Sequence, residues 1–98
     1  MTRLLVIHEA AEAEIAEAAD FYDLQSPDLG GAFIVEVEHT IRSILEFPEA
    51  APLVRGRVRK RIVARFPYSL VYSVRPAEIR ILAVAHHKRR PFYWRSRH

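Results

Sequence analysis

The spacing of hydrophobic positions changes twice along this chain, and each change predicts a different element. A short aliphatic run at residues 4–7 predicts a strand. From residue 9 the apolar positions recur every three or four residues, as they do on one face of a helix. They are Ala11, Ile15, Ala18, Ala19 and Tyr22. We therefore expect a helix over residues 9–24, which the sequence QSPDLGG then interrupts.

A second helix is predicted over residues 27–46, because its apolar positions and one threonine fall on one side. These positions are Leu29, Phe33, Val37, Thr40, Ile41 and Ile44. Ser26 is the expected N-cap, Pro27 the expected first residue, and Pro48 follows the helix end. The pair Gly30 and Gly31 indicates either a close approach of the two helices or a frayed first turn. The short connection predicts an antiparallel helical hairpin.

From residue 58 the period falls to two, the side-chain repeat of a strand. Three strands are predicted, over residues 58–66, 68–74 and 78–85, and RPAE (75–78) is predicted to form the tight turn between the last two. The order β-α-α-β-β-β indicates an α+β fold with the helical hairpin on a mostly antiparallel four-stranded sheet. With 98 residues, the chain is expected to form a single domain over residues 1–98.

The strand predicted over 58–66 belongs to a longer alternating stretch, RGRVRKRIVAR (55–65). Arginine occupies positions 55, 57, 59, 61 and 65, while Val58, Ile62 and Ala64 take even positions. The alternation predicts one strand face in a core and the other carrying guanidinium groups about 6.6–6.8 Å apart, close to the phosphate spacing of a nucleic-acid strand. The alternative is a solvated strand face whose charge protects against aggregation.

Charge divides the chain into two unlike halves. Residues 1–50 hold eleven acids and two basic residues, a balance of −9, whereas residues 51–98 hold thirteen Lys/Arg and one acid, a balance of +12. The asymmetry favours an anionic partner over internal complementarity alone. The chain has no cysteine, which excludes disulfides and thiolate chemistry. Since its N-terminal apolar run is too short for a membrane anchor, we expect a cytoplasmic protein with no membrane association.

The segment HHKRRPFYWRSRH (86–98) interleaves basic and aromatic residues, a combination that can hold phosphates and stack on bases. Aromatics also fasten a chain end to a core, so one or two of Phe92, Tyr93 and Trp94 are expected to be buried. His86 and His87 are candidates for acid–base chemistry, although a structural role is the alternative.

The acids of the first helix are expected on its solvated outer face. They are Glu9, Glu12, Glu14, Glu17, Asp20 and Asp23. No Gly-rich phosphate loop or Ser-His-Asp arrangement can be assembled. No further ligand lies at a suitable spacing near the paired histidines, so we expect neither a metal site nor a cofactor.

The motifs, taken in order, resemble the RelE/ParE superfamily of toxins from type II toxin–antitoxin modules. The stretch FPYSLVYSV followed by ILAVAHHKRRPFYWRSR carries the resemblance. Residues 10–54, from AAEAEIAEAADFYD through to AAPLV, are similar to the family's helical hairpin. The resemblance covers nearly the whole chain and implies the β-α-α-β-β-β fold. It also implies a cognate antitoxin as partner, whose C-terminal segment wraps the toxin.

Two activities occur in this superfamily. RelE-like members cleave mRNA on the ribosome, whereas ParE-like members inhibit DNA gyrase and largely lack the nuclease residues. Ser69 stands where the RelE-type pattern has an arginine, directly before LVY. The sequence FPY (66–68) and a C-terminal set resemble the ParE-like branch, and that set is His86, Arg89, Pro91, Tyr93, Trp94 and Arg97. We favour a gyrase inhibitor that is not an enzyme. The alternatives are a ribosome-dependent mRNA endonuclease and a non-toxic nucleic-acid-binding module.

The resemblance and the charge pattern together nominate site residues. The catalytic candidates, if the chain is a nuclease, are Arg61, Arg65, His87 and Tyr93. The residues expected to bind the target, whether gyrase, the ribosome with its mRNA, or another nucleic acid, are Arg57, Arg59, Arg61, Arg65, His86, Arg89, Arg90 and Arg97.

Overall fold

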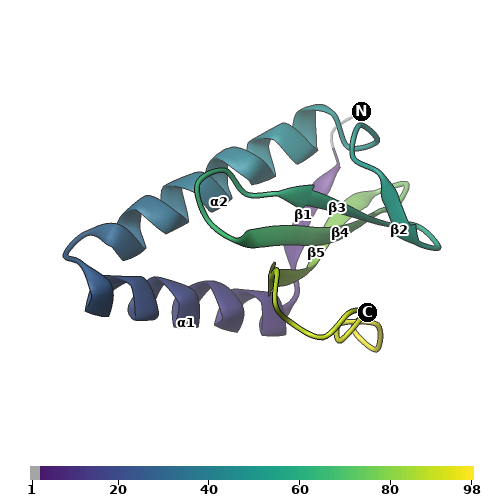
Figure 1. Cartoon of the computed structure of the whole chain (residues 1–98). Coiled ribbons are helices and arrows are strands. Elements are labelled where there is room, and N and C mark those ends of the chain that lie inside the picture. Colours follow the sequence, from purple (N-terminus) through teal and green to yellow (C-terminus); the bar gives the residue numbers. More distant parts are fainter. Residues whose placement is uncertain (1–2) are drawn as a thin grey trace.

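The structure, a computed structural model that describes residues 3–98, has three layers (Figure 1). Its elements are β1 (Leu4–Ile7), α1 (Glu9–Gln25), α2 (Leu29–Glu46), β2 (Leu53–Arg55), β3 (Val58–Ile62), β4 (Tyr68–Val74) and β5 (Glu78–His86). The helices form a hairpin on one face of the sheet, and the C-terminal tail (residues 87–98) lies on the other. The predicted α+β class and helical hairpin are confirmed.

The sheet has five strands in the order β1-β5-β4-β3-β2, not the four that were predicted. β1 runs parallel to β5, and every other pair is antiparallel. The additional strand is β2, which pairs with β3 across a turn where Gly56 has a φ of 54°. A strand of three residues is too short to display a period of two, so the sequence pattern did not reveal it.

The strand predicted over residues 58–66 is shorter than expected, because β3 ends at Ile62. The backbone N–H of Val63 donates to the carbonyl of Tyr68, which starts the connection to β4. Within that connection Arg65 adopts a left-handed conformation with a φ of 71°. Arg65 therefore lies in a turn, outside the strand to which the alternation assigned it.

The two helices pack on each other and on the sheet through the predicted apolar stripes. Phe33, Val37 and Ile44 of α2 are almost fully buried, and Tyr22 of α1 packs against Phe33 with a ring-centroid distance of 5.5 Å. Ile15 is half-buried against the same core. Within residues 3–98, neither helix is both long and apolar enough to cross a membrane.

The start of α2 differs from the prediction. Ser26 closes α1, where its backbone N–H donates to the Tyr22 carbonyl, and does not cap α2. Instead the Asp23 carboxylate accepts from the Gly30 backbone N–H at 2.7 Å. A Cβ atom on Gly30 would lie 2.3 Å from the backbone oxygen of Ala19, whereas one on Gly31 would meet nothing within 4 Å. The close approach of the helices is therefore confirmed at Gly30.

A bulge in β5 changes which residues face each layer. Tyr72 of β4 pairs with Ile81 and Val71 pairs with Ala83, so Leu82 is an extra residue on β5. Because of this shift, Ala83 faces the tail and not the helices. It packs with Val71 and the buried Trp94 in a second, smaller core.

Candidate target-binding surface

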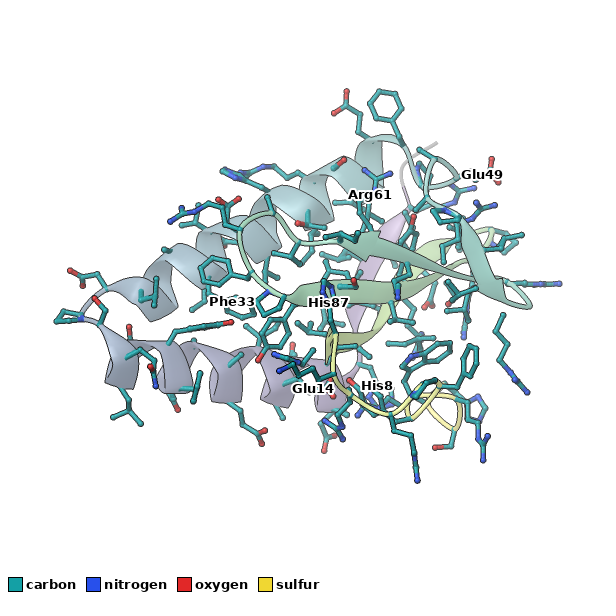
Figure 2. All side chains as sticks on the ribbon, in the orientation of Figure 1. His8, Glu14, Phe33, Glu49, Arg61 and His87 are labelled. Atoms are coloured by element: carbon teal, nitrogen blue, oxygen red, sulfur yellow. The ribbon has the colours of Figure 1, made fainter. Side chains whose placement is uncertain are left out.

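Arg59 and Arg61 lie on the helical side of β3 and hold the end of α2. One guanidinium nitrogen of Arg59 donates to the carbonyls of Glu49 at 3.0 Å and Ala51 at 2.6 Å. Arg61 donates to the Ser43 hydroxyl and to the Phe47 carbonyl. Figure 2 shows Arg61 reaching from β3 toward α2. Arg61 thus binds the C-terminal end of α2, and Arg59 binds two carbonyls of the connection between α2 and β2.

The remaining arginines of the alternating stretch do not continue a row. Arg55 lies on β2, Arg57 lies in the β2–β3 turn, and Arg65 lies beyond β3. The aliphatic residues expected between them in a core also diverge. Val58 is half-buried beneath the tail, whereas the side chain of Ile62 is 67% exposed. A phosphate-tracking ladder with regular strand spacing is therefore wrong, because a hairpin turn and a left-handed turn interrupt the strand.

Glu14 of α1 fastens the tail to the rest of the fold. Its carboxylate accepts from the Tyr93 hydroxyl at 2.6 Å and from two nitrogens of Arg97 at 2.9 and 3.1 Å. It also accepts from the backbone N–H of Val84 in β5 at 2.9 Å. Figure 2 shows Glu14 projecting from α1 toward the beginning of the tail. The Glu14 side chain is only 12% exposed, so the expectation that it lies on a solvated face is wrong.

The electrostatics of this contact fix the protonation of its partners. Burial raises the pKa of the Tyr93 hydroxyl, and the hydrogen bond to the Glu14 carboxylate raises it further. The same carboxylate raises the pKa of Arg97.

A sequence signal for Glu14 did exist, since it stands three residues after Ala11 and four before Ala18. Both alanines are buried, and this spacing puts Glu14 on the same helix face.

A cleft of about 230 Å³ lies between the tail and the sheet. Its polar lining residues come from β3, β4, the end of β5 and the tail. The residues that line it are Val54, Lys60, Ser69, Val71, Ala85, His86, His87, Arg89, Arg90, Pro91, Phe92, Tyr93 and Trp94. Inside it, His87 Nε2 and the Ser69 hydroxyl share a hydrogen bond of 3.0 Å. His86 contacts the Tyr68 ring, and its Nδ1 accepts from the Lys88 backbone N–H.

The structure brings only two of the four nuclease candidates, His87 and Tyr93, to the same cleft. Arg61 is on the helical side of the sheet, and His87 is on the tail side with Ser69. Arg65 forms a surface ion pair with Glu36 at 3.6 Å. The Tyr93 hydroxyl is already bonded to a carboxylate. In the part of the chain that is described, no group of three His, Cys, Asp or Glu side chains could hold a metal ion.

Comparison with known proteins identifies the family. Residues 5–91 match the family described as "ParE toxin of type II toxin-antitoxin system, parDE". This chain belongs to the ParE toxin family. A chain of the solved structure "Chromosomal ParDE TA system from P. aeruginosa" shares its fold, with a TM-score of 0.77 and 19% sequence identity. The similarity covers 87% of this chain and 96% of that one. A search of curated protein sequences finds no match.

Family membership confirms the resemblance and its ParE-like branch. The family match ends at Pro91, so Tyr93, Trp94 and Arg97 lie outside it. These are the residues through which the tail packs on the sheet and binds Glu14. The roles of these three residues are therefore inferred from the contacts in this structure and not from the family match.

Proposed function

We propose that this toxin is held inactive by a cognate antitoxin and that, once released, it inhibits DNA gyrase without catalysing a reaction. Membership of the ParE family supports a role in a toxin–antitoxin pair. The observation that carries the non-catalytic part is the dispersal of the nuclease candidates over both faces of the sheet. A general acid or base must lie within hydrogen-bonding reach of the reacting group. His87 and Tyr93 line one cleft, but Arg61 and Arg65 lie elsewhere, so the four side chains share no such point.

Tyr93 is the clearest case against the nuclease. Its hydroxyl donates to Glu14, and its raised pKa keeps it protonated over the whole physiological range. To take part in cleavage it would have to leave a charge-assisted hydrogen bond of 2.6 Å. Arg61 is similarly engaged, because its guanidinium holds the end of α2. Both side chains are better explained by stability than by catalysis.

We propose that the target is bound by the exposed basic residues along the cleft. Arg89 and Arg90 project from the tail at its rim, and His86 joins them from the end of β5. Arg89 stacks over the Tyr93 ring at 4.0 Å, which orients its guanidinium while leaving the side chain 55% exposed. An acidic surface of the target would match this rim in charge.

The antitoxin contact is proposed for the outer surface of the helical hairpin and the neighbouring sheet edge. Large apolar side chains are exposed at both ends of the hairpin: Leu24 is 86% and Phe21 53% exposed near the end of α1, and Phe47 is 59% exposed directly after α2. Exposed apolar groups of this size are typical of surfaces that a partner covers. A disordered antitoxin segment with aliphatic anchors would cover these apolar side chains and fold as it binds.

Inducible expression in bacteria, with separate readouts for DNA damage and for mRNA integrity, tests the proposed function. We expect growth arrest with filamentation and a DNA-damage response while bulk mRNA stays intact, and inhibition of supercoiling by purified gyrase. The double variant Arg89→Ala/Arg90→Ala should lose toxicity, whereas Arg42→Ala, which removes an exposed charge from α2, should keep it. Growth arrest by a chain that leaves the activity of purified gyrase unchanged would contradict the proposal that it is a gyrase inhibitor.

One observation favours the ribosome-dependent endonuclease as the second candidate. The hydrogen-bonded pair of His87 and Ser69 lies in the cleft beside Arg89 and Arg90, an arrangement that could bind a phosphodiester next to an imidazole. If this candidate were correct, His87→Ala would abolish toxicity, and ribosome-bound mRNA would be cut by the unmodified chain. We expect His87→Ala to remain toxic and mRNA to stay whole.

A further inference from the structure

A second hollow, of about 450 Å³, lies at the other end of the tail side of the sheet. Three segments that are far apart in the sequence meet around it: the β2–β3 turn, the β4–β5 turn and the end of the tail. We call it the arginine hollow. Its lining residues are Arg57, Val58, Ser73, Arg75, Pro76, Leu82, Arg95, Arg97 and His98.

The arginine hollow carries positive charge and has no acidic side chain in its lining. Arg97 is neutralised by Glu14, but Arg57, Arg75 and Arg95 form no ion pair within residues 3–98. Guanidinium groups that share a hollow repel one another, and a bound anion would convert this repulsion into attraction.

Glu78 relieves the positive charge of the arginine hollow only in part. The hydrogen bond from Arg80 Nε, at 2.7 Å, lowers the pKa of the Glu78 carboxyl most, and the charge of Arg75 adds a smaller effect in the same direction. Glu78 does not line the hollow. The three unpaired arginines therefore remain available to a ligand.

The lining also contains a buried hydroxyl without a hydrogen bond. Ser73 is 5% exposed. Among the buried side-chain nitrogen and oxygen atoms of the described residues, its Oγ alone makes no hydrogen bond. Nearly all buried polar side-chain atoms in proteins have a partner, and an orphaned one calls for an explanation. A ligand oxygen that reaches between the surrounding arginine side chains would supply the missing partner.

We propose that the arginine hollow binds a phosphate group, with Arg57, Arg75 and Arg95 as its charged ligands and Ser73 as a hydrogen-bond donor. A guanidinium group matches the oxygens of phosphate in a bidentate way. A phosphate monoester with two negative charges also neutralises three arginines better than one carboxylate does, and so do successive phosphodiesters of a nucleic acid, each with one charge. The hollow is open and large enough for a phosphate with its sugar. This site lies outside the cleft and does not depend on gyrase inhibition.

The phosphate could belong to a nucleic-acid backbone or to a small phosphorylated molecule, and titrations of the full-length chain distinguish these sources. The probes are inorganic phosphate, pyrophosphate, dAMP, and single- and double-stranded DNA of eight nucleotides per strand. Binding is followed by calorimetry and by NMR signals of the arginine side chains. We expect saturable binding that shifts signals of Arg57, Arg75 and Arg95.

The variants distinguish binding at the arginine hollow from non-specific attraction of anions to a positively charged protein. Arg95→Gln should weaken binding about tenfold, the effect of losing one charge-assisted contact, and Ser73→Ala should weaken it severalfold. Arg42→Gln, which removes the same charge from α2, should change it less than twofold. Circular dichroism verifies that each variant is folded, and Ser73→Ala removes only a hydroxyl. Tighter binding and a steeper salt dependence for DNA than for dAMP would identify a nucleic-acid ligand, and equal affinities a small one.

Two results would overturn the proposal. One is wild-type affinity for all probes in both Arg95→Gln and Ser73→Ala. The other is an equal loss of affinity in Arg42→Gln. Since no readout involves toxicity or gyrase, a negative result here leaves the proposed function intact, and failure of gyrase inhibition leaves this proposal intact.

Discussion

Replacing Glu14 by glutamine tests whether one carboxylate holds the tail on the fold. Glutamine keeps the size of the side chain but removes the charge that Tyr93, Arg97 and the Val84 N–H share. Its amide nitrogen is a donor and cannot accept from Arg97. The substitution therefore leaves the largely buried Arg97 guanidinium beside a neutral amide that does not compensate its charge.

The expected loss follows from the burial of the pair. Removing one partner of a buried ion pair costs about 3–5 kcal/mol, and a hydrogen bond to a charged group contributes about 1.5–3 kcal/mol. Because the side chains of Glu14 and Arg97 remain 12% and 16% exposed, water screens part of this energy. We expect the free energy of unfolding to fall by about 2–3 kcal/mol. For a domain of this size the midpoint temperature would fall by about 10–20 °C.

Urea and thermal unfolding measure the global change, and fluorescence measures the tail itself. Trp94 is the only tryptophan in the chain and is 6% exposed, so its emission reports release of the tail from the sheet. Glu17→Gln is the matched control, because Glu17 is exposed on the next turn of α1. It should change stability by less than about 0.5 kcal/mol.

A double-mutant cycle isolates the pair. Combining Glu14→Gln with Arg97→Gln should give a coupling energy of at least about 1 kcal/mol, as expected for side chains that share a hydrogen-bond network. A Glu14→Gln variant as stable as the wild type, or a coupling energy of zero, would refute the reasoning.

Three further predictions follow from local geometry. Gly30→Ala should destabilise the chain by about 1–3 kcal/mol in urea unfolding, because its methyl group meets the backbone of α1, while Gly31→Ala should stabilise it by about 0.5–1 kcal/mol; the reverse order would contradict the close helix approach. Arg61→Ala should cost about 1–2 kcal/mol and the exposed Arg65→Ala less than about 0.5 kcal/mol in the same assay; equal losses would argue against a role of Arg61 at the end of α2. Burial and a neighbouring carboxylate raise the pKa of Tyr93, so the tyrosine of the unfolded chain ionises first. The contribution of Tyr93 to the free energy of unfolding is therefore intact below about pH 10 and falls at higher pH by up to about 1.4 kcal/mol per pH unit. Between pH 9 and 11.5 Tyr93→Phe should lose stability less steeply than the wild type, and parallel profiles would refute this.

The helical hairpin could be predicted from the sequence because its signal is local. Phe33, Val37 and Ile44 repeat at intervals of three and four, and each is buried as that spacing requires. The same reasoning failed in the stretch 55–65, where a period of two was continued across a hairpin turn. A turn of two residues preserves alternation in the sequence while reversing the chain direction, so the arginine pattern survived a change of strand.

The site was harder to predict because its contacts are long-range. Glu14 and Arg97 are 83 residues apart, and the arginine hollow draws on three separate segments. Periodicity reports which face of an element is buried, but it does not say which residue meets it. Glu14 illustrates this limit. It was predicted to be solvent-exposed because it is charged, although its spacing from two buried alanines puts it on the buried face of the helix.

The tail contact also explains why a charged pair, and not an apolar one, occupies this part of the fold. β1 pairs with β5 only as far as Ile81, so among the described residues no strand lies beside the outer edge of β5 beyond that point. There the Val84 N–H donates to Glu14 and the Leu82 carbonyl accepts from Arg97. Apolar side chains of similar volume can match a buried ion pair in stability, but they would leave both backbone groups without partners. The Glu14–Arg97 pair thus takes the place of a strand residue, and in doing so it sets where the tail, the cleft and the arginine hollow lie.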